Sequence, residues 1–126
     1  MSRPTVALID RSALRVNMAL AQSLAPKSQI MPMVKANAYG HGMVQVAQAL
    51  AGNAPAFGVA CIEEALELRN SGIDQPILLL EGTFSRDEIE VAAKNNFWLM
   101  IENDPQKTAV LEAKLEHPIH VWIGID

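Results

Sequence analysis

The sequence has only one cysteine, Cys61, so no disulfide can form within the chain and no pair of thiols is available to bind a metal. We interpret Cys61 as a small buried hydrophobe rather than a reactive thiol. Long apolar runs are also missing, and the first residues lack the charged-then-apolar pattern of a secretion signal. We therefore expect a cytoplasmic protein without membrane spans.

Neither sign of charge dominates, because 10 lysines and arginines face 14 aspartates and glutamates, and the two kinds are interleaved. The net charge of −4 and the lack of a basic block argue against nucleic acid or an anionic membrane as a partner. Half of the 126 residues are nevertheless apolar, which is enough for the core of one folded domain.

Short apolar segments alternate with helical patterns along the chain. From residue 29 onward, a helix is predicted between each pair of strands, which indicates parallel strands joined by right-handed crossovers. Pro32 lies inside the first of these strands, where we expect a bulge or a missing hydrogen bond. The predicted strands cover residues 5–9, 29–34, 57–60, 77–80, 97–101 and 119–123.

Three of the predicted helices begin at recognisable capping residues. Asp10 is placed to cap the helix that runs to Pro26. Ser85 and Glu88 have the spacing of a capping box. Asp104 with a proline at the first helical position opens the last helix.

Lys35 stands at the end of the strand predicted for residues 29–34. A side chain at the carboxyl end of a parallel strand lies beside the crevice where α/β folds bind ligands. An amine partly removed from water there is able to attack a carbonyl carbon. The alternative is a lysine whose stem packs on apolar surface while its ammonium reaches solvent. Tyr39 offers a ring and a hydroxyl near the same place.

The residues around Lys35 closely resemble the signature of the bacterial alanine racemases. The matching run is residues 34–42, with the sequence VKANAYGHG. The similarity covers essentially the whole chain, but only about the first third of what such a racemase normally contains. Further similar segments are residues 56–60, 62–65, 76–82 and 121–122.

The resemblance implies the N-terminal fragment of a pyridoxal-phosphate-dependent alanine racemase, which interconverts L- and D-alanine for cell-wall precursors and acts as a homodimer. The lysine that matches Lys35 carries pyridoxal 5′-phosphate in the family and moves the substrate proton on one face. A tyrosine from a second subunit serves the other face. Tyr39 matches a position that helps hold the phosphate, and Leu80 matches a region that flanks the ring. The isolated fragment is expected to be inactive.

The implied fold is α/β, a partial (β/α)8 TIM-type barrel truncated after about five βα units, because a closed barrel needs about 250 residues. Residues 1–28 would form an N-terminal strand and helix. Residues 29–126 would form the first part of the pyridoxal-phosphate-binding barrel, without the C-terminal β domain. A free-standing doubly wound sheet of flavodoxin type is the structural alternative. The unpaired edges of an open barrel predict association or aggregation.

Other readings of the chain stay open. The protein could be a racemase of wider substrate range or a non-catalytic module that binds pyridoxal phosphate. Gly124 stands where many relatives carry a lysine, which puts the carbamate of that lysine in doubt here. Asn37 is expected to fix its loop, and His41 to bond to backbone. Two further groups are interpreted as structural: Glu63 with Glu64 as the acidic first turn of a helix, and Glu116, His117 and His120 as residues that bind no metal.

Overall fold

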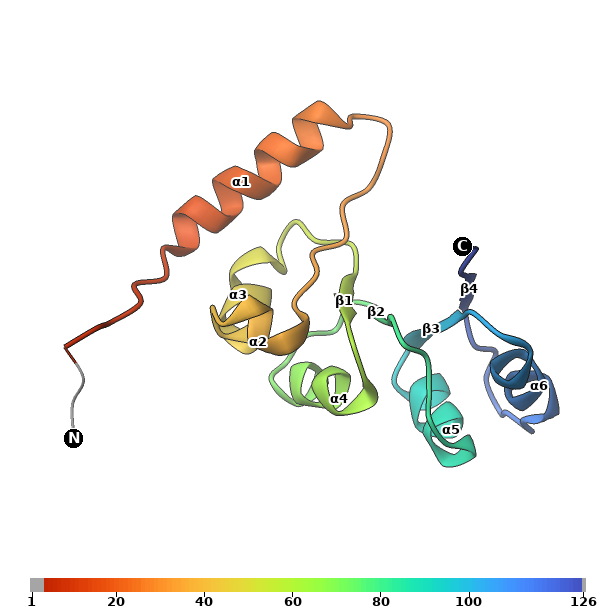
Figure 1. The fold of residues 1–126 in the computed structure, drawn as a ribbon. Coiled ribbons are helices and arrows are strands. Elements are labelled where there is room, and N and C mark those ends of the chain that lie inside the picture. Colours follow the sequence, from red (N-terminus) through yellow and green to blue (C-terminus); the bar gives the residue numbers. More distant parts are fainter. Residues whose placement is uncertain (1–3, 126) are drawn as a thin grey trace.

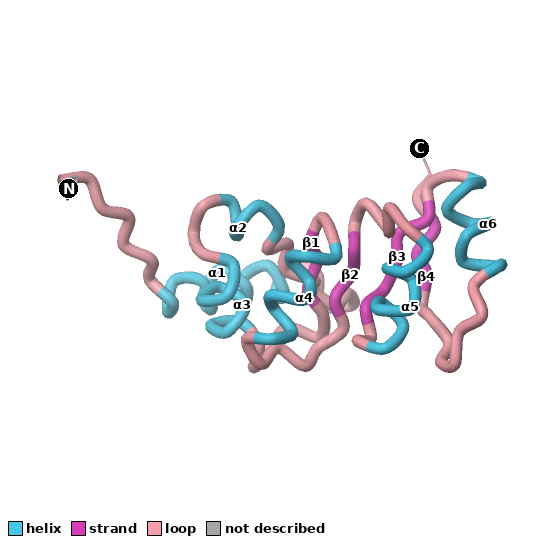
Figure 2. The backbone as a smooth tube through the Cα atoms, turned by 90° about the horizontal axis from the view of Figure 1, so that it is seen from below, coloured by secondary structure: helices cyan, strands magenta, loops and turns pink. Residues whose placement is uncertain are grey.

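A computed structural model describes residues 4–125 as a parallel four-stranded sheet with helices between the strands. Its strand order is β1-β2-β3-β4, so each strand pairs with the one before it in the sequence. The helices α4, α5 and α6 lie on one side of this sheet (Figures 1 and 2). The strands are β1 (Phe57–Val59), β2 (Ile77–Leu79), β3 (Phe97–Ile101) and β4 (Val121–Ile123). The helices are α1 (Arg11–Leu24), α2 (Lys35–Tyr39), α3 (Met43–Leu50), α4 (Ile62–Asn70), α5 (Arg86–Lys94) and α6 (Asp104–Glu112).

The sheet has the organisation of a barrel segment. All three strand pairs are parallel and in simple succession, with Gly58 opposite Leu78 and Leu78 opposite Trp98. A doubly wound sheet reverses its strand order near the first strand, and these strands show no such reversal. The partial (β/α)8 barrel expected from the resemblance is therefore confirmed.

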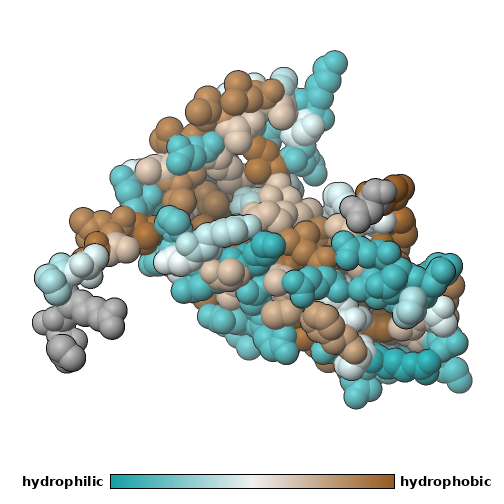
Figure 3. Space-filling model, in the orientation of Figure 1, coloured by the Kyte–Doolittle hydropathy of each residue, from teal (hydrophilic) through white to brown (hydrophobic). Residues whose placement is uncertain are grey.

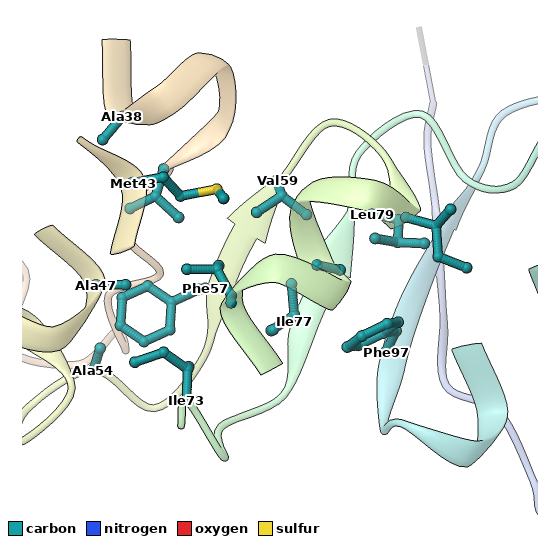
Figure 4. Packing of buried hydrophobic residues seen from close by; sticks show 14 of the residues in the cluster. Ala38, Met43, Ala47, Ala54, Phe57, Val59, Ile73, Ile77, Leu79 and Phe97 are labelled. Carbon is teal, nitrogen blue, oxygen red and sulfur yellow. The ribbon is translucent and has the colours of Figure 1, made fainter. Parts of the chain in front are cut away.

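The core lies between the sheet and its helices. Along β3 the buried residues Phe97, Leu99 and Ile101 alternate with half-buried ones, as expected when one face of a strand packs against helices. Figure 4 shows Phe57 and Ile77 among the side chains of this buried cluster. The opposite face carries Trp98 and Trp122, whose rings stack at 6.1 Å between centroids.

The strand predicted for residues 29–34 is reduced to a single parallel bridge between Met33 and Gly58. The Gly58 N–H donates to the Pro32 carbonyl at 3.0 Å, and the Val34 N–H donates to the Gly58 carbonyl at 2.8 Å. The ladder ends toward the N-terminus because its next bond would need an N–H that Pro32 lacks. It ends on the other side because the Val34 carbonyl accepts from Ala38 instead, at 2.9 Å.

The strand predicted for residues 5–9 is wrong. This segment pairs with no strand in the described part of the chain, and its side chains of Val6 and Leu8 are 71% and 91% exposed. A strand forms only where a neighbour supplies ladder hydrogen bonds, so apolar alternation alone was insufficient. No helix within residues 4–125 has the length and apolarity needed to cross a membrane.

The cap of α1 is confirmed, whereas two others differ from prediction. Asp10 Oδ1 accepts from the N–H groups of Ser12 and Ala13 at 2.8 and 3.2 Å. Ser85 makes no side-chain cap bond. Glu88 does accept from a backbone N–H before the helix, that of Phe84 at 2.7 Å, so only the glutamate bond of the capping box has a counterpart here. The N-cap of α6 is Asn103 rather than Asp104. Asn103 acts as the cap because its Oδ1 accepts from the N–H of Gln106, at 2.9 Å.

Candidate active site

Lys35 follows directly on the bridge to β1, at the carboxyl end of the sheet. Figure 2 shows α2, which begins at Lys35, level with the end of the sheet where the chain also leaves β4. Lys35 is half-buried, and within residues 4–125 its amine has no hydrogen-bond or ion-pair partner. Because the strands are parallel, Leu80, Glu102 and Gly124 come to the same edge after β2, β3 and β4.

The segment α2 is a turn of left-handed helix, which the sequence did not predict. Residues 36–39 have φ angles between 51° and 54°, and Gly40 continues the turn at φ 89°. Each left-handed residue other than glycine costs about 1–2 kcal/mol, so such a run needs support from its surroundings. Inside the turn, the Gly42 N–H donates to the Asn37 carbonyl at 2.9 Å. The backbone that leaves Lys35 is therefore sharply defined.

Asn37 and His41 fix this turn, as the sequence indicated. Asn37 Oδ1 accepts from the Met43 N–H at 2.9 Å and so joins the turn to the start of α3. His41 Nδ1 lies 3.0 Å from the Ala38 carbonyl, which it contacts as a donor when that nitrogen carries the proton. Gly42 adopts a positive φ of 91° between the turn and α3, a conformation that glycine reaches without steric cost.

Glu64 contacts the same turn, a role that sequence reasoning missed. Its Oε1 accepts from the Ala36 N–H at 2.8 Å, and its Oε2 accepts from the Ala60 N–H at 2.7 Å. One carboxylate therefore joins the residue after Lys35 to the end of β1. Its place as the third residue of α4 was a usable signal, since acidic side chains there reach back to backbone N–H groups. That its second partner would be Ala36, in the turn after Lys35, could not be predicted from the sequence.

Gln106, the third residue of α6, makes a similar connection between the next strand ends. Its Oε1 accepts from the Glu102 N–H at 2.8 Å, and its Nε2 donates to the Glu81 carbonyl at 3.1 Å. Leu80, next to Glu81, is half-buried and donates its N–H to Val59 at 2.9 Å. The edge that carries Lys35 and Leu80 is thus held together by side chains from the helices.

Tyr39 and Leu80 lie on different elements of this edge. Tyr39 ends the left-handed turn and is 62% exposed, and its hydroxyl has no hydrogen bond to another described residue. Leu80 is separated from the turn by β1. A shallow polar hollow between the ends of β3 and β4 is lined by Glu102, Asn103, Gly124 and Ile125.

Gly124 and Cys61 carry no reactive group into this edge. A Cβ on Gly124 would lie 2.9 Å from Glu102 Cγ, so a larger residue there requires Glu102 to move. Burial raises the pKa of the Cys61 thiol, which disfavours the nucleophilic thiolate. Among the described residues, no group of three histidine, cysteine, aspartate or glutamate side chains is placed to hold a metal ion.

The residues at this edge fit pyridoxal 5′-phosphate. An aldehyde reacts with a primary amine, and Lys35 supplies one on a fixed backbone with no carboxylate of the described residues paired to it. A phosphate requires hydrogen-bond donors, and the exposed Tyr39 hydroxyl is available for that bond. The half-buried Leu80 offers apolar surface on a neighbouring strand end.

Comparisons with known proteins agree with this geometry. The profile of the family "Alanine racemase, N-terminal domain" matches residues 9–126. The chain is 48% identical over 126 residues to the alanine racemase of Chromohalobacter salexigens, covering all of this chain and 35% of that protein. It is 48% identical over 124 residues to the catabolic alanine racemase of Pseudomonas aeruginosa, covering 98% of this chain and 34% of the relative.

Solved structures show the same similarity. The biosynthetic alanine racemase of Pseudomonas aeruginosa superposes with a TM-score of 0.93 at 46% identity, over 99% of this chain and 35% of that one. A histidine racemase from Leuconostoc mesenteroides superposes with a TM-score of 0.78 at 31% identity, over 88% of this chain and 30% of that one. The chain therefore spans about a third of the length of these relatives. With Lys35 at the strand edge and the family profile matched from residue 9 onward, the chain belongs to the alanine racemase family, which uses pyridoxal 5′-phosphate.

Proposed function

We propose that this chain supplies the cofactor lysine and one of the two proton-transfer groups of an alanine racemase. The observation that carries the proposal is the amine of Lys35, which is half-buried, has no partner among residues 4–125 and lies at the carboxyl edge of a barrel segment. Lys35 would hold pyridoxal phosphate covalently, with Tyr39 at its phosphate and Leu80 beside its ring. The bound cofactor supplies an electron sink that weakens the Cα–H bond of an amino acid.

Once the amino group of the substrate takes the place of Lys35 on the cofactor, Lys35 Nζ is again a free primary amine on a fixed backbone. It would then accept the Cα proton from one face or return it there. Racemisation also needs a proton-transfer group on the opposite face. Tyr39 is the only tyrosine in the sequence and lies on the same turn as Lys35, so it does not provide that group. We therefore propose that the chain is inactive by itself.

The whole protein would interconvert L- and D-alanine and thereby supply D-alanine for cell-wall precursors. Support for alanine comes from the names of the relatives that match this chain. A racemase of wider substrate range is the second candidate, because a segment 31% identical to this chain occurs in a histidine racemase. A non-catalytic module that binds pyridoxal phosphate is the third, since Lys35 and Tyr39 would suffice for binding.

We also propose a cytoplasmic homodimer. The free thiol of Cys61 agrees with a reducing compartment. All three residues of β4 are exposed, and Figure 3 shows further apolar surface along α1, where Val16, Leu20 and Leu24 are more than half exposed. Such surface favours association. Sedimentation of the chain as a compact monomer would count against this part of the proposal.

The cofactor assignment is tested by incubating the chain with pyridoxal phosphate, reducing with borohydride and locating the modified lysine by mass spectrometry. We expect modification at Lys35 and little at Lys27, an exposed lysine in the loop after α1. Lys35→Arg should remove the signal. Equal modification of both lysines would contradict the proposal.

Activity is tested separately by following the optical rotation of L-alanine. The chain alone should leave the rotation unchanged. A chimera in which this chain replaces its counterpart in the Pseudomonas aeruginosa biosynthetic racemase should make the optical rotation of L-alanine decay. The rest of that enzyme then supplies the missing groups. An active isolated chain would show that the second proton-transfer group lies within these residues.

A further inference from the structure

We propose that Glu64 is the positioning residue of Lys35. This inference deepens the proposed function and depends on it, since it concerns how the cofactor lysine is presented. Glu64 itself is a residue of α4, the helix that follows the neighbouring strand β1. It acts on Lys35 through the backbone and not through the reacting atoms.

The hydrogen bonds around Lys35 show how this works. The preceding residue, Val34, donates its N–H to Gly58 of β1 at 2.8 Å. The following residue, Ala36, donates its N–H to Glu64 Oε1 at 2.8 Å. Lys35 is therefore the single residue between two anchored N–H groups, one held by the sheet and one held by a helix. Removal of the second anchor leaves the residue after Lys35 held only by the bonds within the turn and to α3.

Glu64 also replaces a missing part of the sheet. In a regular parallel ladder the Ala60 N–H would donate to the Val34 carbonyl, but that carbonyl accepts from Ala38 within the left-handed turn. The Ala60 N–H donates to Glu64 Oε2 instead, at 2.7 Å. The carboxylate thus satisfies the donor that the turn leaves without an acceptor. The pairing with β1 can end before Lys35 and the turn can begin there because this one side chain satisfies both N–H groups.

A carboxylate is the group that this arrangement requires. Both partners are donors, and an ionised carboxylate presents two acceptor oxygens. Glutamine at this position would present one oxygen and one NH2 group, and the NH2 group would face a backbone donor. Glu64→Gln therefore breaks one of the two anchors while it keeps the size of the side chain. Glu63→Gln is the matched control, because Glu63 is the exposed neighbour in the same helical turn and has the same charge.

The test uses the full chain and compares wild type, Glu64→Gln and Glu63→Gln. The first readout is amide hydrogen exchange at Ala36 and Ala60. In Glu64→Gln we expect at least one of them to exchange about 10- to 100-fold faster, as follows from loss of a hydrogen bond to a charged group. The amide of Leu80, which donates to Val59 in the neighbouring ladder, reports whether the sheet stays intact.

The second readout is the rate of borohydride-fixed pyridoxal phosphate modification at Lys35, divided by the rate at Lys27 in the same molecule. We expect this ratio to fall about tenfold in Glu64→Gln and to stay unchanged in Glu63→Gln. Glu64→Asp keeps both acceptor oxygens on a shorter stem and should recover part of the ratio. A merely structural role would not produce this recovery with an unchanged Leu80 amide.

The outcomes separate the two proposals. Equal modification of Lys35 and Lys27 in the wild-type chain overturns the cofactor assignment. Faster amide exchange in Glu64→Gln would still show that Glu64 holds the turn. Selective wild-type modification that persists in Glu64→Gln, with unchanged exchange at Ala36 and Ala60, overturns the role of Glu64. If Glu64→Gln also loses Leu80 protection, the ratio in Glu64→Asp decides: recovery supports positioning, and a ratio as low as in Glu64→Gln overturns it.

Discussion

Met33 packs directly over Gly58, at the point where the segment before Lys35 joins the sheet. A Cβ on Gly58 would lie 2.4 Å from Met33 Sδ, closer than real side-chain atoms approach. We expect Gly58→Ala to lower the free energy of unfolding by about 1 kcal/mol, since the end of the flexible Met33 side chain can move only partly. Urea unfolding followed by circular dichroism measures this.

Met33→Ala provides the control for that change. In a chain that already carries Met33→Ala, the nearest remaining neighbour of the added methyl at Gly58 is Met31 Sδ, at an ordinary contact distance of 3.7 Å. The cost of Gly58→Ala should therefore fall to less than half. Equal costs in the two backgrounds would show that the methyl acts through the backbone of β1 and not through Met33.

Ala36 tests the strain in the left-handed turn. Its φ of 51° is difficult for a β-branched side chain, and the residue is exposed, so packing does not confuse the result. We expect Ala36→Val to destabilise by about 1–2 kcal/mol. Ala36→Gly should change stability by less than about 0.5 kcal/mol, because relief of strain offsets the larger entropy of the unfolded chain.

The matched control for Ala36→Val is Ala19→Val, at an exposed position in the right-handed helix α1. Only the helix propensity changes there, which costs about 0.5 kcal/mol. Thermal unfolding of the three variants gives the comparison. Equal effects of valine at the two positions would contradict a left-handed turn at Ala36.

The N-terminal cap of α1 should weaken as the pH is lowered. The Ser12 hydroxyl, followed by the backbone N–H groups of Ala13 and Ser12, holds the pKa of Asp10 below its ordinary value. A carboxyl whose pKa is lowered by folding stabilises above its unfolded pKa, and this stability is lost as pH falls through the lowered folded pKa. The protection of the Ser12 and Ala13 amides, measured as exchange relative to an unstructured peptide at the same pH, should therefore fall below about pH 4. Asp10→Asn keeps a capping oxygen without a charge and should remove this pH dependence.

Replacing Arg69 by alanine should lower the free energy of unfolding far more than replacing Arg86. Arg69 donates to the carbonyls of Ile73 and Asn95, the latter at 2.6 Å, and lies over the ring of Phe97 at 5.3 Å. Burial lowers its pKa, which Asp74 opposes. We expect Arg69→Ala to cost about 2–4 kcal/mol, because carbonyls would lose charged donors.

Arg86 is the control for that substitution. It pairs with Glu112 at 2.5 Å, but both side chains are more than half exposed. Solvent and salt screen such a pair, so Arg86→Ala should cost less than about 0.5 kcal/mol in urea unfolding. A loss at Arg86 as large as that at Arg69 would mean that the exposed pair is more important than its exposure indicates.

The sequence predicted the elements whose cause is local. The stop at Pro26 and the cap at Asp10 place α1 almost to the residue, and the apolar run at β3 matches its bounds. Residues 5–9 were misread because a strand depends on a ladder partner, which local alternation does not reveal. The left-handed turn was missed for a similar reason. Alanine and tyrosine do not favour positive φ, so only bonds to distant groups such as Glu64 could indicate it.

The candidate site divides in the same way. Lys35 and Tyr39 are predicted site residues on the strength of their motif. The bonds of Asn37 and His41 follow from the chemistry of those side chains in tight turns. Glu64 and Gln106 were not found, since each joins strand ends that are more than 20 residues apart in the sequence. Their helix position predicts a bond to the backbone, but only the tertiary structure shows which backbone.

The strand order has a consequence for how the protein is made. Each strand pairs with its immediate predecessor, so the partner of every new strand has already left the ribosome when that strand emerges. The sheet can grow by one strand and one helix at a time during translation, and the segment before Lys35 can pair with β1 before β2 emerges. The seat of the reactive amine is thus among the earliest parts of the molecule that can be completed.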